Sequence, residues 1–528
     1  MLRPGSGLRC AAATAITARH MRRHARVVRQ LALLISLEAA HLSVQAIETP
    51  AMLSVDTSLA VTDNIESAAS GDRRSDVIAS IRPRLRWKRR GSDLEVDLDA
   101  TANVLGHSNA EPRGRVLPDV RASLRSTLVD KWLIVDADAR VRQAEVSAYG
   151  ARADDSRAAS QRTEGTYSLR PHVERLLAPD TLLSGAYGVT LTTNGANAGA
   201  RGVTRSGVIR LEWLPVPFGA AAELAGLDTE TSQVGRSRLS IQTLRVSGSA
   251  VLADEWTLGA VAGQERIRFL GSAQTDPLYG VDLKWKPTLR TSVAASVEHR
   301  FFGVGGEVAA SHRTPNLSLG LLLSRQPTLS PSALRVGSNA DLRTYLDAIL
   351  TTRYPDAAVR DSVVDSLLRV QEIDTRAPVA STVVAQYPQL LTTASAHLAV
   401  LGRRDTVAVT VFVQTSRLLE HLGETASAGA GVPIVDDSRQ FGASFQLNHR
   451  LTPQVSAEAI VRRSRIVGFA ERSGDASNET VYRLTLLRHV SDQYALSAGL
   501  QHNRFETNVA GLTSYQATTL FVGASYQF

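Results

Sequence analysis

The sequence predicts an all-β protein: a large transmembrane antiparallel β-barrel of about 22 strands (range 16–22) with a helical insertion. Three observations lead to this fold class. Polar and apolar residues alternate along stretches of roughly 10–16 residues, which is the period of a strand with two different faces. The connections between these stretches alternate between short and long. The chain also ends on an alternating stretch that closes with Phe528.

The first segment, residues 1–46, is predicted to be a secretory signal peptide. Four arginines between positions 22 and 29 precede a short apolar stretch, and Val44-Gln45-Ala46 is a small-residue cleavage site. Met21 is an alternative start of the chain. The barrel is therefore expected over residues 47–528.

Removal of this segment changes the charge balance. It takes away seven Arg and one Glu, so that 59 basic and 51 acidic residues become 52 and 50. A general polyanion-binding protein is not expected at that balance. The only cysteine, Cys10, leaves with the segment, so neither disulfides nor cysteine metal sites are predicted.

The first hairpin of the mature chain combines a basic strand with an acidic one. In SIRPRLRWKRR (80–90) every second position from Arg82 to Lys88 is basic. In DLEVDLDATANV (93–104) every second position from Asp93 to Asp99 is acidic. A turn at 89–92 sets opposite charges across the pair, each stabilising by roughly 0.2–1 kcal/mol. The predicted pairs are Arg82–Asp99, Arg84–Asp97, Arg86–Glu95 and Lys88–Asp93. Because the basic run has partners within its own hairpin, no nucleic-acid partner is predicted. Pro83 is unusual inside a paired strand and indicates either a bulge or a displaced strand.

A second charged row follows in KWLIVDADARVR (131–142). Asp136, Asp138, Arg140 and Arg142 share one face of the expected strand. Two interpretations of the charged rows stay open. They are either a structural ladder that stiffens the wall or a lumenal charge array that screens passing solutes.

A transmembrane barrel accounts for these strands as a set. They are longer than the five or six residues usual in soluble proteins, and their apolar faces are too numerous for a water-soluble sandwich to bury. In lipid every backbone N–H and C=O must be paired, and a closed barrel leaves no edge. Short turns are expected on the periplasmic side and long loops outside. The predicted location is the bacterial outer membrane, with membrane lipid and the barrel assembly machinery as partners.

Residues 327–386 interrupt the alternation. Leu342, Leu346 and Ile349 have helical spacing, and a second helical pattern follows Pro355, with Asp356 as its N-cap. Counting connections from a periplasmic N-terminus places this insertion on the outer side. It is expected to be a plug in the lumen, a lid over the mouth, or a helical hairpin on the surface.

The C-terminal strand carries a predicted assembly signal. Leu520, Val522, Ala524, Tyr526 and Phe528 alternate along LFVGASYQF. A last strand that ends in Phe with apolar residues at alternate positions resembles the recognition signal of outer-membrane barrels.

Five short motifs resemble a known family. They are VTDNI (61–65), SDVIASIRPRL (75–85), TYSLRPHV (166–173), RFFG (300–303) and SHRT (311–314). In this order they resemble the outer-membrane β-barrel proteins associated with PEP-CTERM/exosortase systems. The resemblance implies a protein encoded among exopolysaccharide production and protein-sorting functions, with the polysaccharide and its export machinery as partners. It implies no catalytic site.

No motif for catalysis, cofactor binding or metal binding is present, so the chain is not expected to be an enzyme or to need a cofactor. The leading hypothesis is a channel or secretion component. A closed scaffolding barrel is the alternative. A lipid-modifying barrel enzyme is the second alternative, with His489 near Ser491, or His502, as the nominated histidines.

Overall fold

The structure is a computed structural model that describes residues 47–48, 51–109, 114–129, 132–145, 149–151, 161–194, 201–214, 217–231, 237–269, 272–328, 333–335, 342–351, 353–357, 359–361, 363–364, 382–384, 389–419 and 437–528. The predicted signal peptide and its cleavage site lie outside these residues.

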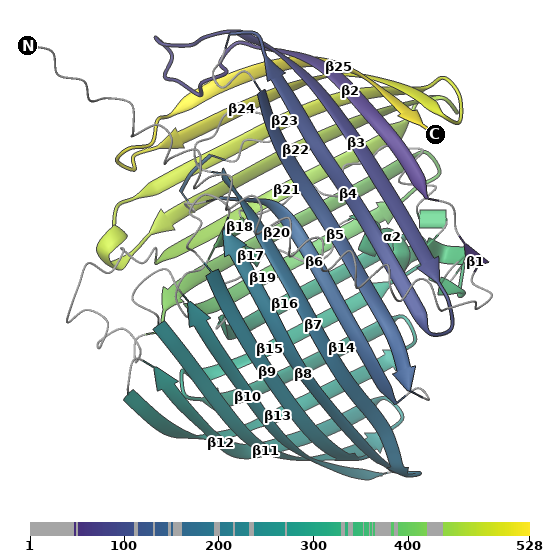
Figure 1. Ribbon diagram of the computed structural model, residues 1–528, viewed down its shortest axis with the longest axis vertical. Helices are drawn as coiled ribbons and strands as arrows, with labels where there is room; N and C mark the ends of the chain where they lie inside the picture. The colour runs from purple at the N-terminus through teal and green to yellow at the C-terminus, as the bar shows by residue number, and fades with distance from the viewer. Residues whose placement is uncertain are drawn as a thin grey trace, which may run out of the picture.

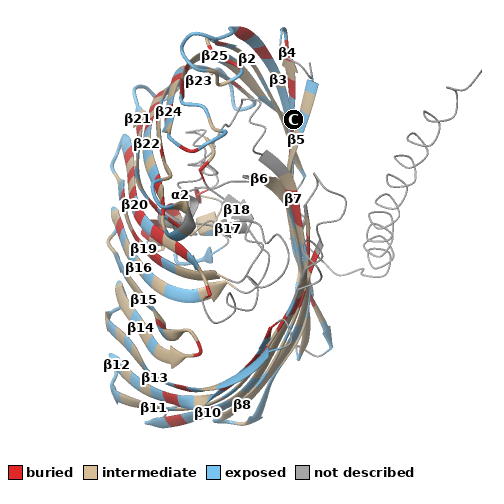
Figure 2. Ribbon diagram, turned by 90° about the vertical axis from the view of Figure 1, so that its left-hand side faces the viewer, coloured by how far each residue is buried: buried red, intermediate tan, exposed pale blue. Residues whose placement is uncertain are grey.

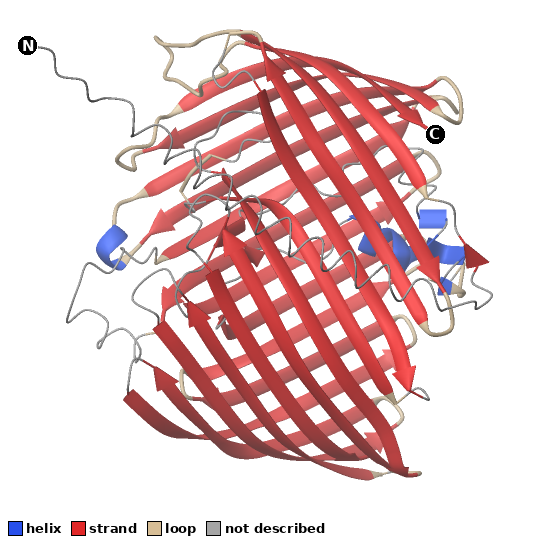
Figure 3. Cartoon of the chain, viewed as in Figure 1, coloured by secondary structure: helices blue, strands red, loops and turns tan. Residues whose placement is uncertain are grey.

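Twenty-two antiparallel strands form the wall of the barrel, as the alternation predicts (Figures 1 and 3). They are β2 (Met52–Thr62), β3 (Asp76–Arg90), β4 (Leu94–His107), β5 (Gly114–Val129), β6 (Leu133–Glu145), β7 (Gln161–Ala178), β8 (Thr181–Asn194), β9 (Arg201–Trp213), β10 (Phe218–Thr231), β11 (Ser237–Ala253), β12 (Trp256–Phe269), β13 (Ser272–Thr288), β14 (Thr291–Arg300), β15 (Gly303–Arg313), β16 (Leu317–Thr328), β19 (Gln389–Leu401), β20 (Asp405–Leu418), β21 (Ser438–Arg450), β22 (Val455–Gly468), β23 (Ala476–His489), β24 (Tyr494–Thr507) and β25 (Tyr515–Gln527).

Each strand pairs with its neighbours in the chain, and the first and last strands close the ring. β2 pairs with β25 from Ser54 opposite Gln527 to Thr62 opposite Thr519. β16 pairs with β19 across the insertion. Three short strands lie outside the ring: β1 (Ile47–Glu48) pairs with the end of β3, and β17 (Ala333–Arg335) pairs with β18 (Thr382–Val384). Closure leaves no unpaired strand edge, which is the condition for crossing a bilayer.

The two ends of the barrel differ in their connections. The turns at 91–93, 179–180 and 254–255 share one end with the beginning of β2 and the end of β25, on the right of Figure 1. The connections at 63–75, 146–160 and 419–437 share the other end. Short periplasmic turns and long external loops are typical of outer-membrane barrels. The first end is therefore the periplasmic one.

The outward face of the wall is apolar and exposed. Leu224, Val281 and Leu520 are 57%, 60% and 61% exposed, and they alternate with inward residues. Figure 2 shows this alternation around the whole ring. An exposed apolar surface of this extent needs lipid around it.

Aromatic side chains mark the periplasmic edge of this apolar surface. All five tryptophans lie at or near the periplasmic turns: Trp87, Trp132, Trp213, Trp256 and Trp285. The rings of Trp256 and Trp285 stack with centroids 5.1 Å apart. Tryptophan prefers the membrane–water interface because one part of its ring is apolar and its N–H is polar. The girdle fixes the depth of the barrel in the membrane.

One girdle tryptophan is tied to a turn carboxylate, and this gives a pH prediction. Trp213 Nε1–H donates a 2.7 Å hydrogen bond to Asp180 Oδ2, and this bond holds the pKa of Asp180 below its ordinary value. This hydrogen bond stabilises the fold above the ordinary pKa of Asp180, and the stabilisation is lost as the pH falls through the lowered pKa. We expect the fluorescence of Trp213 to change over that acidic range and not to change there in Asp180→Asn. If the fluorescence of Asp180→Asn changes with pH as that of the wild type does, the assignment is contradicted.

Pro83 is accommodated without a bulge. The pairing of β3 with β4 skips Arg82 and Pro83 and resumes in the same register, from Ile81 opposite Val104 to Arg84 opposite Thr101. Proline lacks the N–H that the ladder needs at this point. The strand is therefore neither displaced nor bulged, contrary to both alternatives that the sequence suggests.

The C-terminal strand lies at the seam of the ring. Leu520 and Val522 point outward and are exposed, and the rings of Tyr526 and Phe528 meet edge to face at 4.8 Å. Phe528 N–H donates to Leu53 O across the seam at 2.9 Å. We expect deletion of Phe528 to reduce the folded protein in outer membranes several-fold, with Phe521→Leu as the control because Phe521 is inward. Undiminished assembly without Phe528 contradicts the predicted signal.

Candidate functional site

The inner wall of the barrel holds most of the predicted charged rows. Leu85 of β3 is exposed to the lipid side, so the alternate positions of β3 face inward. Eleven of the twelve predicted ladder residues are inward: Arg82, Arg84, Arg86, Lys88, Glu95, Asp97, Asp99, Asp136, Asp138, Arg140 and Arg142. Only Asp93 lies elsewhere, in the turn between β3 and β4.

In this first hairpin each residue of β3 lies opposite a residue of β4 that is four positions beyond the predicted partner. Arg86 lies opposite Asp99, and Lys88 lies opposite Asp97. The turn comprises residues 91–93, where Gly91 N–H donates to Leu94 O at 2.9 Å, so β3 continues to Arg90. The predicted pairs, Lys88–Asp93 among them, are therefore wrong.

Opposite charges nevertheless meet along the wall in the observed register. Arg84 Nε and Nη2 donate to the two carboxylate oxygens of Asp99 at 3.0 and 2.7 Å. Lys88 Nζ lies 3.7 Å from Asp97 Oδ2. Bidentate guanidinium–carboxylate bonds are both stronger and more directional than point-charge contacts. These contacts join β3 to β4, and the remaining polar atoms of the charged rows face the lumen.

The charged rows border a groove on the inner wall toward the periplasmic end. Its volume is about 510 Å³. Acidic and basic side chains alternate around it, so neither sign dominates. The charged lining residues are Lys88, Arg89, Arg90, Glu95, Asp97, Arg125, Asp136, Asp138 and Arg170. Gly188, Thr190 and Ser206 contribute to the lining from β8 and β9. Such a surface offers many hydrogen-bond donors and acceptors to a polar solute.

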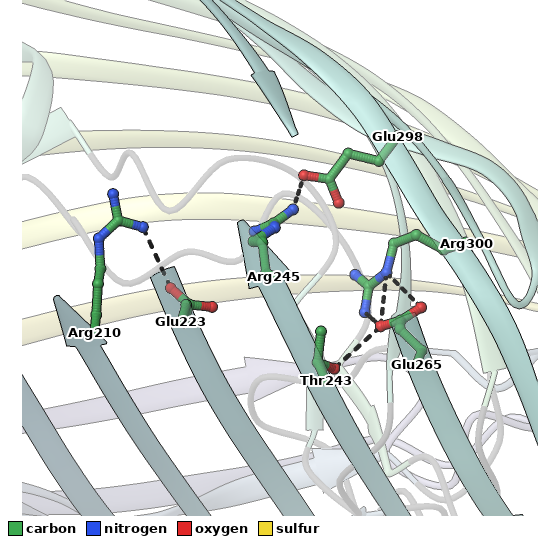
Figure 4. A network of polar contacts seen from close by, with 7 residues as sticks. All are labelled: Arg210, Glu223, Thr243, Arg245, Glu265, Glu298 and Arg300. Carbon is green, nitrogen blue, oxygen red and sulfur yellow. Dashed lines mark hydrogen bonds and ion pairs between the residues drawn. The ribbon is translucent and has the colours of Figure 1, made fainter. Parts of the chain in front are cut away.

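A second ionic network, which the sequence analysis did not predict, lies on β9 to β14 (Figure 4). The carboxylate of Glu265 is fully buried and accepts hydrogen bonds from Arg300 Nε, at 3.1 Å to each oxygen, and from Thr243 Oγ1 at 3.3 Å. Arg245 pairs with Glu298. The signal in the sequence was Glu265 itself, because it shares an otherwise apolar face with Val261 and Ile267. A lone carboxylate on such a face needs a cationic partner.

Hydroxyl and amide groups predominate on another part of the inner wall, on β19 to β24. The buried side chains that carry them are Thr393, Ser395, Thr406, Thr410, Gln414, Ser416, Gln440, Asn448, Ser456, Ser477 and Gln501. Charged side chains also face inward there: Glu458, Arg462, Glu479 and Arg483. The lumen therefore has a sector dominated by charges and a sector in which hydroxyl and amide groups outnumber them.

The insertion between β16 and β19 reaches the periplasmic end of the lumen. Its helix α2 (Leu342–Leu350) lies inside the ring in Figure 2. Leu346 and Ile349 pack with Ala399 and Ala408, which are inward residues beside the periplasmic turn of β19 and β20. Apolar contacts thus hold α2 against one sector of the inner wall.

A second helical turn follows α2 and contacts a different sector. Asp356 Oδ1 accepts a 2.9 Å hydrogen bond from Val359 N–H, which is the predicted N-cap. Arg360 Nε donates to Asp347 Oδ1 of α2 at 2.7 Å. Asp361 Oδ2 then accepts from Lys88 Nζ at 3.0 Å and from Arg90 Nη2 at 3.3 Å. The insertion therefore connects β19 and β20 to β3 across the lumen. Leu367, which the predicted second helix also includes, lies outside the described residues.

Apolar clusters lie near the outer end of the lumen. Tyr149, in the connection after β6, is fully buried against Ile466 of β22 and Val509. Phe301, in the turn between β14 and β15, packs with Phe269 of β12 and Leu419. Each cluster joins strands that are far apart around the ring.

Two of the residues nominated for an enzyme, Ser491 and His502, form local hydrogen bonds. Ser491 Oγ accepts hydrogen bonds from the backbone N–H groups of Gln493 and Tyr494, at 3.3 and 3.1 Å, in a periplasmic turn. His502 Nδ1 bonds Thr518 Oγ1 at 3.0 Å. In the described part of the chain, no group of three or more His, Cys, Asp or Glu side chains is placed to hold a metal ion. No helix among the described residues is long and apolar enough to span a membrane.

Comparisons with known proteins bear on the fold alone. No protein-family model matches the chain, and no curated protein matches it. Among solved structures, the FrpB iron transporter of Neisseria meningitidis is 9% identical, with 91% of this chain and 83% of that one covered and a TM-score of 0.49. The siderophore receptor PirA of Pseudomonas aeruginosa is 10% identical, with coverage of 90% and 80% and a TM-score of 0.39.

A variant of the ferric enterobactin receptor PfeA of Pseudomonas aeruginosa, in complex with enterobactin, is 11% identical, with coverage of 91% and 82% and a TM-score of 0.44. None of these similarities bears on solute or partner. The closed ring, its apolar outer face and its tryptophan girdle identify the chain as a 22-strand β-barrel protein of the bacterial outer membrane.

Proposed function

We propose that this barrel is a gated channel for a polar solute and that the segment between β16 and β19 is its plug. The observation that carries the proposal is the position of Asp361. It belongs to a segment that leaves the wall at the outer end, yet its carboxylate bonds Lys88 and Arg90 beside a periplasmic turn. A segment that passes from one end of a lumen to the other obstructs it.

The contacts of the plug suit reversible release. One side is a small apolar cluster around Leu346 and Ile349, and the other is an ion pair whose two side chains are each 25% exposed. Such contacts together contribute only a few kcal/mol. A plug held in this way can leave the wall without unfolding the barrel, because the strands stay paired through their own backbone hydrogen bonds.

A saccharide is the solute class that we propose. Support comes from the many hydroxyl and amide side chains on the inner face of β19 to β24 and from the resemblance to barrels associated with exopolysaccharide production. Hydroxyl and amide groups donate and accept hydrogen bonds, as the hydroxyls of a sugar do. The proposed place of the protein is in exopolysaccharide export beside exosortase-type protein sorting. Deletion of the gene should reduce the polysaccharide released from cells.

Conductance in planar bilayers tests the channel. We expect the wild-type protein to be closed for most of the time and a variant with residues 329–388 replaced by a short Gly/Ser linker to show large, stable openings. Heat-modifiable migration on gels checks that the deletion variant is folded.

The conductance of the deletion variant also separates the proposal from the scaffolding alternative. The clusters around Tyr149 and Phe301 favour that alternative, because they join distant strands near the outer end. A folded deletion variant that never conducts overturns the channel and supports a closed scaffold.

A further inference from the structure

Five arginines gather on the outward face of β20 to β24, above the apolar surface. Outward positions on these strands are those that alternate with the buried inward residues, as Val413, Phe441 and Leu484 do. The five are Arg417, Arg439, Arg463, Arg465 and Arg504, and all are exposed. They form the arginine patch.

The register places the patch at the outer membrane surface. Tyr482 lies opposite His502, with their rings 6.5 Å apart, and Tyr482 is 50% exposed on the lipid side. Two residues further toward the outer end, Thr480 lies opposite both Arg463 of β22 and Arg504 of β24. The arginines therefore begin one step above an aromatic pair, where lipid headgroups replace acyl chains.

The patch has a large excess of positive charge. Among the described outward residues in the outer halves of these five strands, Glu506 is the only carboxylate, and Arg504 is its partner. The same rim is balanced on β9 to β11, where Arg205 pairs with Glu230 and Arg238 with Asp228. Like charges this close repel one another, so the patch is stabilised by an anion that the described chain does not supply.

We propose that the arginine patch binds the phosphate groups of lipid A in the outer leaflet. Guanidinium groups bind phosphate through two parallel hydrogen bonds, and each basic residue near a charged membrane surface contributes roughly a fivefold gain in affinity. Two of the arginines have oriented side chains: Arg417 lies over the ring of Phe469 at 5.0 Å, and Arg439 Nε donates to Thr415 Oγ1 at 3.3 Å. The ligand is thus a phosphorylated lipid, held at the outer surface of the wall and independent of the lumen.

Native mass spectrometry of the full-length mature barrel in detergent tests the proposal. Hexa-acylated bisphosphorylated lipid A is titrated into the wild type and into Arg463→Gln/Arg465→Gln/Arg504→Gln. We expect the triple variant to bind on the order of a hundredfold more weakly. The matched control Arg205→Gln/Arg238→Gln, on the balanced part of the same rim, should bind as the wild type does.

A second titration needs no variant and so does not depend on the folding of one. The wild type is titrated with lipid A from which both phosphates have been removed, and it should bind at least tenfold more weakly. Equal affinity for the dephosphorylated lipid, or undiminished binding by the folded triple variant, overturns the proposal. Neither titration measures conductance, so the outcome for lipid binding is independent of the outcome of the conductance test of the plug.

Discussion

Replacing Asp361 by lysine is expected to raise the open probability of the channel roughly 30- to 150-fold. The change removes two charge-assisted hydrogen bonds, from Lys88 and Arg90, and sets a third positive charge beside them. Their loss destabilises the closed state by about 2–3 kcal/mol. Single-channel recording of the variant in planar bilayers measures the effect.

A charge exchange is the control for this prediction. In Lys88→Asp/Asp361→Lys the ion pair is restored with its signs reversed, although Asp97 and Arg90 then each face a like charge. The double variant should regain much of the closed state. If both variants open as seldom as the wild type, the contact between Asp361 and β3 does not hold the plug.

Replacing Arg300 by methionine is expected to lower the free energy of unfolding by about 3–5 kcal/mol, because it leaves a buried carboxylate without its cation. Glu265 has no exposure to solvent, and Arg300 is the charged group that bonds both of its oxygens. Urea unfolding of the barrel in liposomes, followed by tryptophan fluorescence, gives the value.

Two further variants define the cause. Glu265→Leu/Arg300→Met removes both charges and should recover most of the lost stability. Arg205→Gln breaks the ion pair of Arg205 with Glu230, in which the two side chains are 42% and 46% exposed. This change should lower the free energy of unfolding by less than about 1 kcal/mol. Equal losses from Arg205→Gln and Arg300→Met would show that burial of Glu265 has no part in the effect.

The alternation in the sequence was sufficient to predict the barrel. Leu94, Val96 and Leu98 take one face of β4, and Glu95, Asp97 and Asp99 take the other. A strand in a membrane wall separates lipid from water, so the polarity of its residues alternates with the face that they take along most of its length. The strand number followed from counting these alternating stretches along the chain.

The register and the plug contacts could not be predicted in the same way. Moving the first turn from residues 89–92 to 91–93 shifts the partner of each residue by four positions, which keeps every side chain on its face. Polarity therefore cannot distinguish the two registers. The bond from Asp361 to Lys88 joins residues 273 positions apart, and no local pattern reports such a contact. Glu265 and Arg300 are 35 positions apart and meet only because β12 and β14 both turn these side chains inward.

The central claim is that the segment after β16 lies inside the lumen against β3. Paired spin labels test it directly, because Cys10 is the only cysteine of the chain and lies in the predicted signal peptide. Nitroxides are placed in the reconstituted barrel at Ser123→Cys, an inward neighbour of Lys88 on the wall, and at Ala357→Cys, one helical turn before Asp361, so that the ion pair itself stays intact. A control pair joins position 357 to the lipid-facing Leu244. Strong dipolar broadening for the pair 123–357 and none for the pair 244–357 is the expected result. An unbroadened spectrum for the pair 123–357 would place the segment away from β3 and contradict the account.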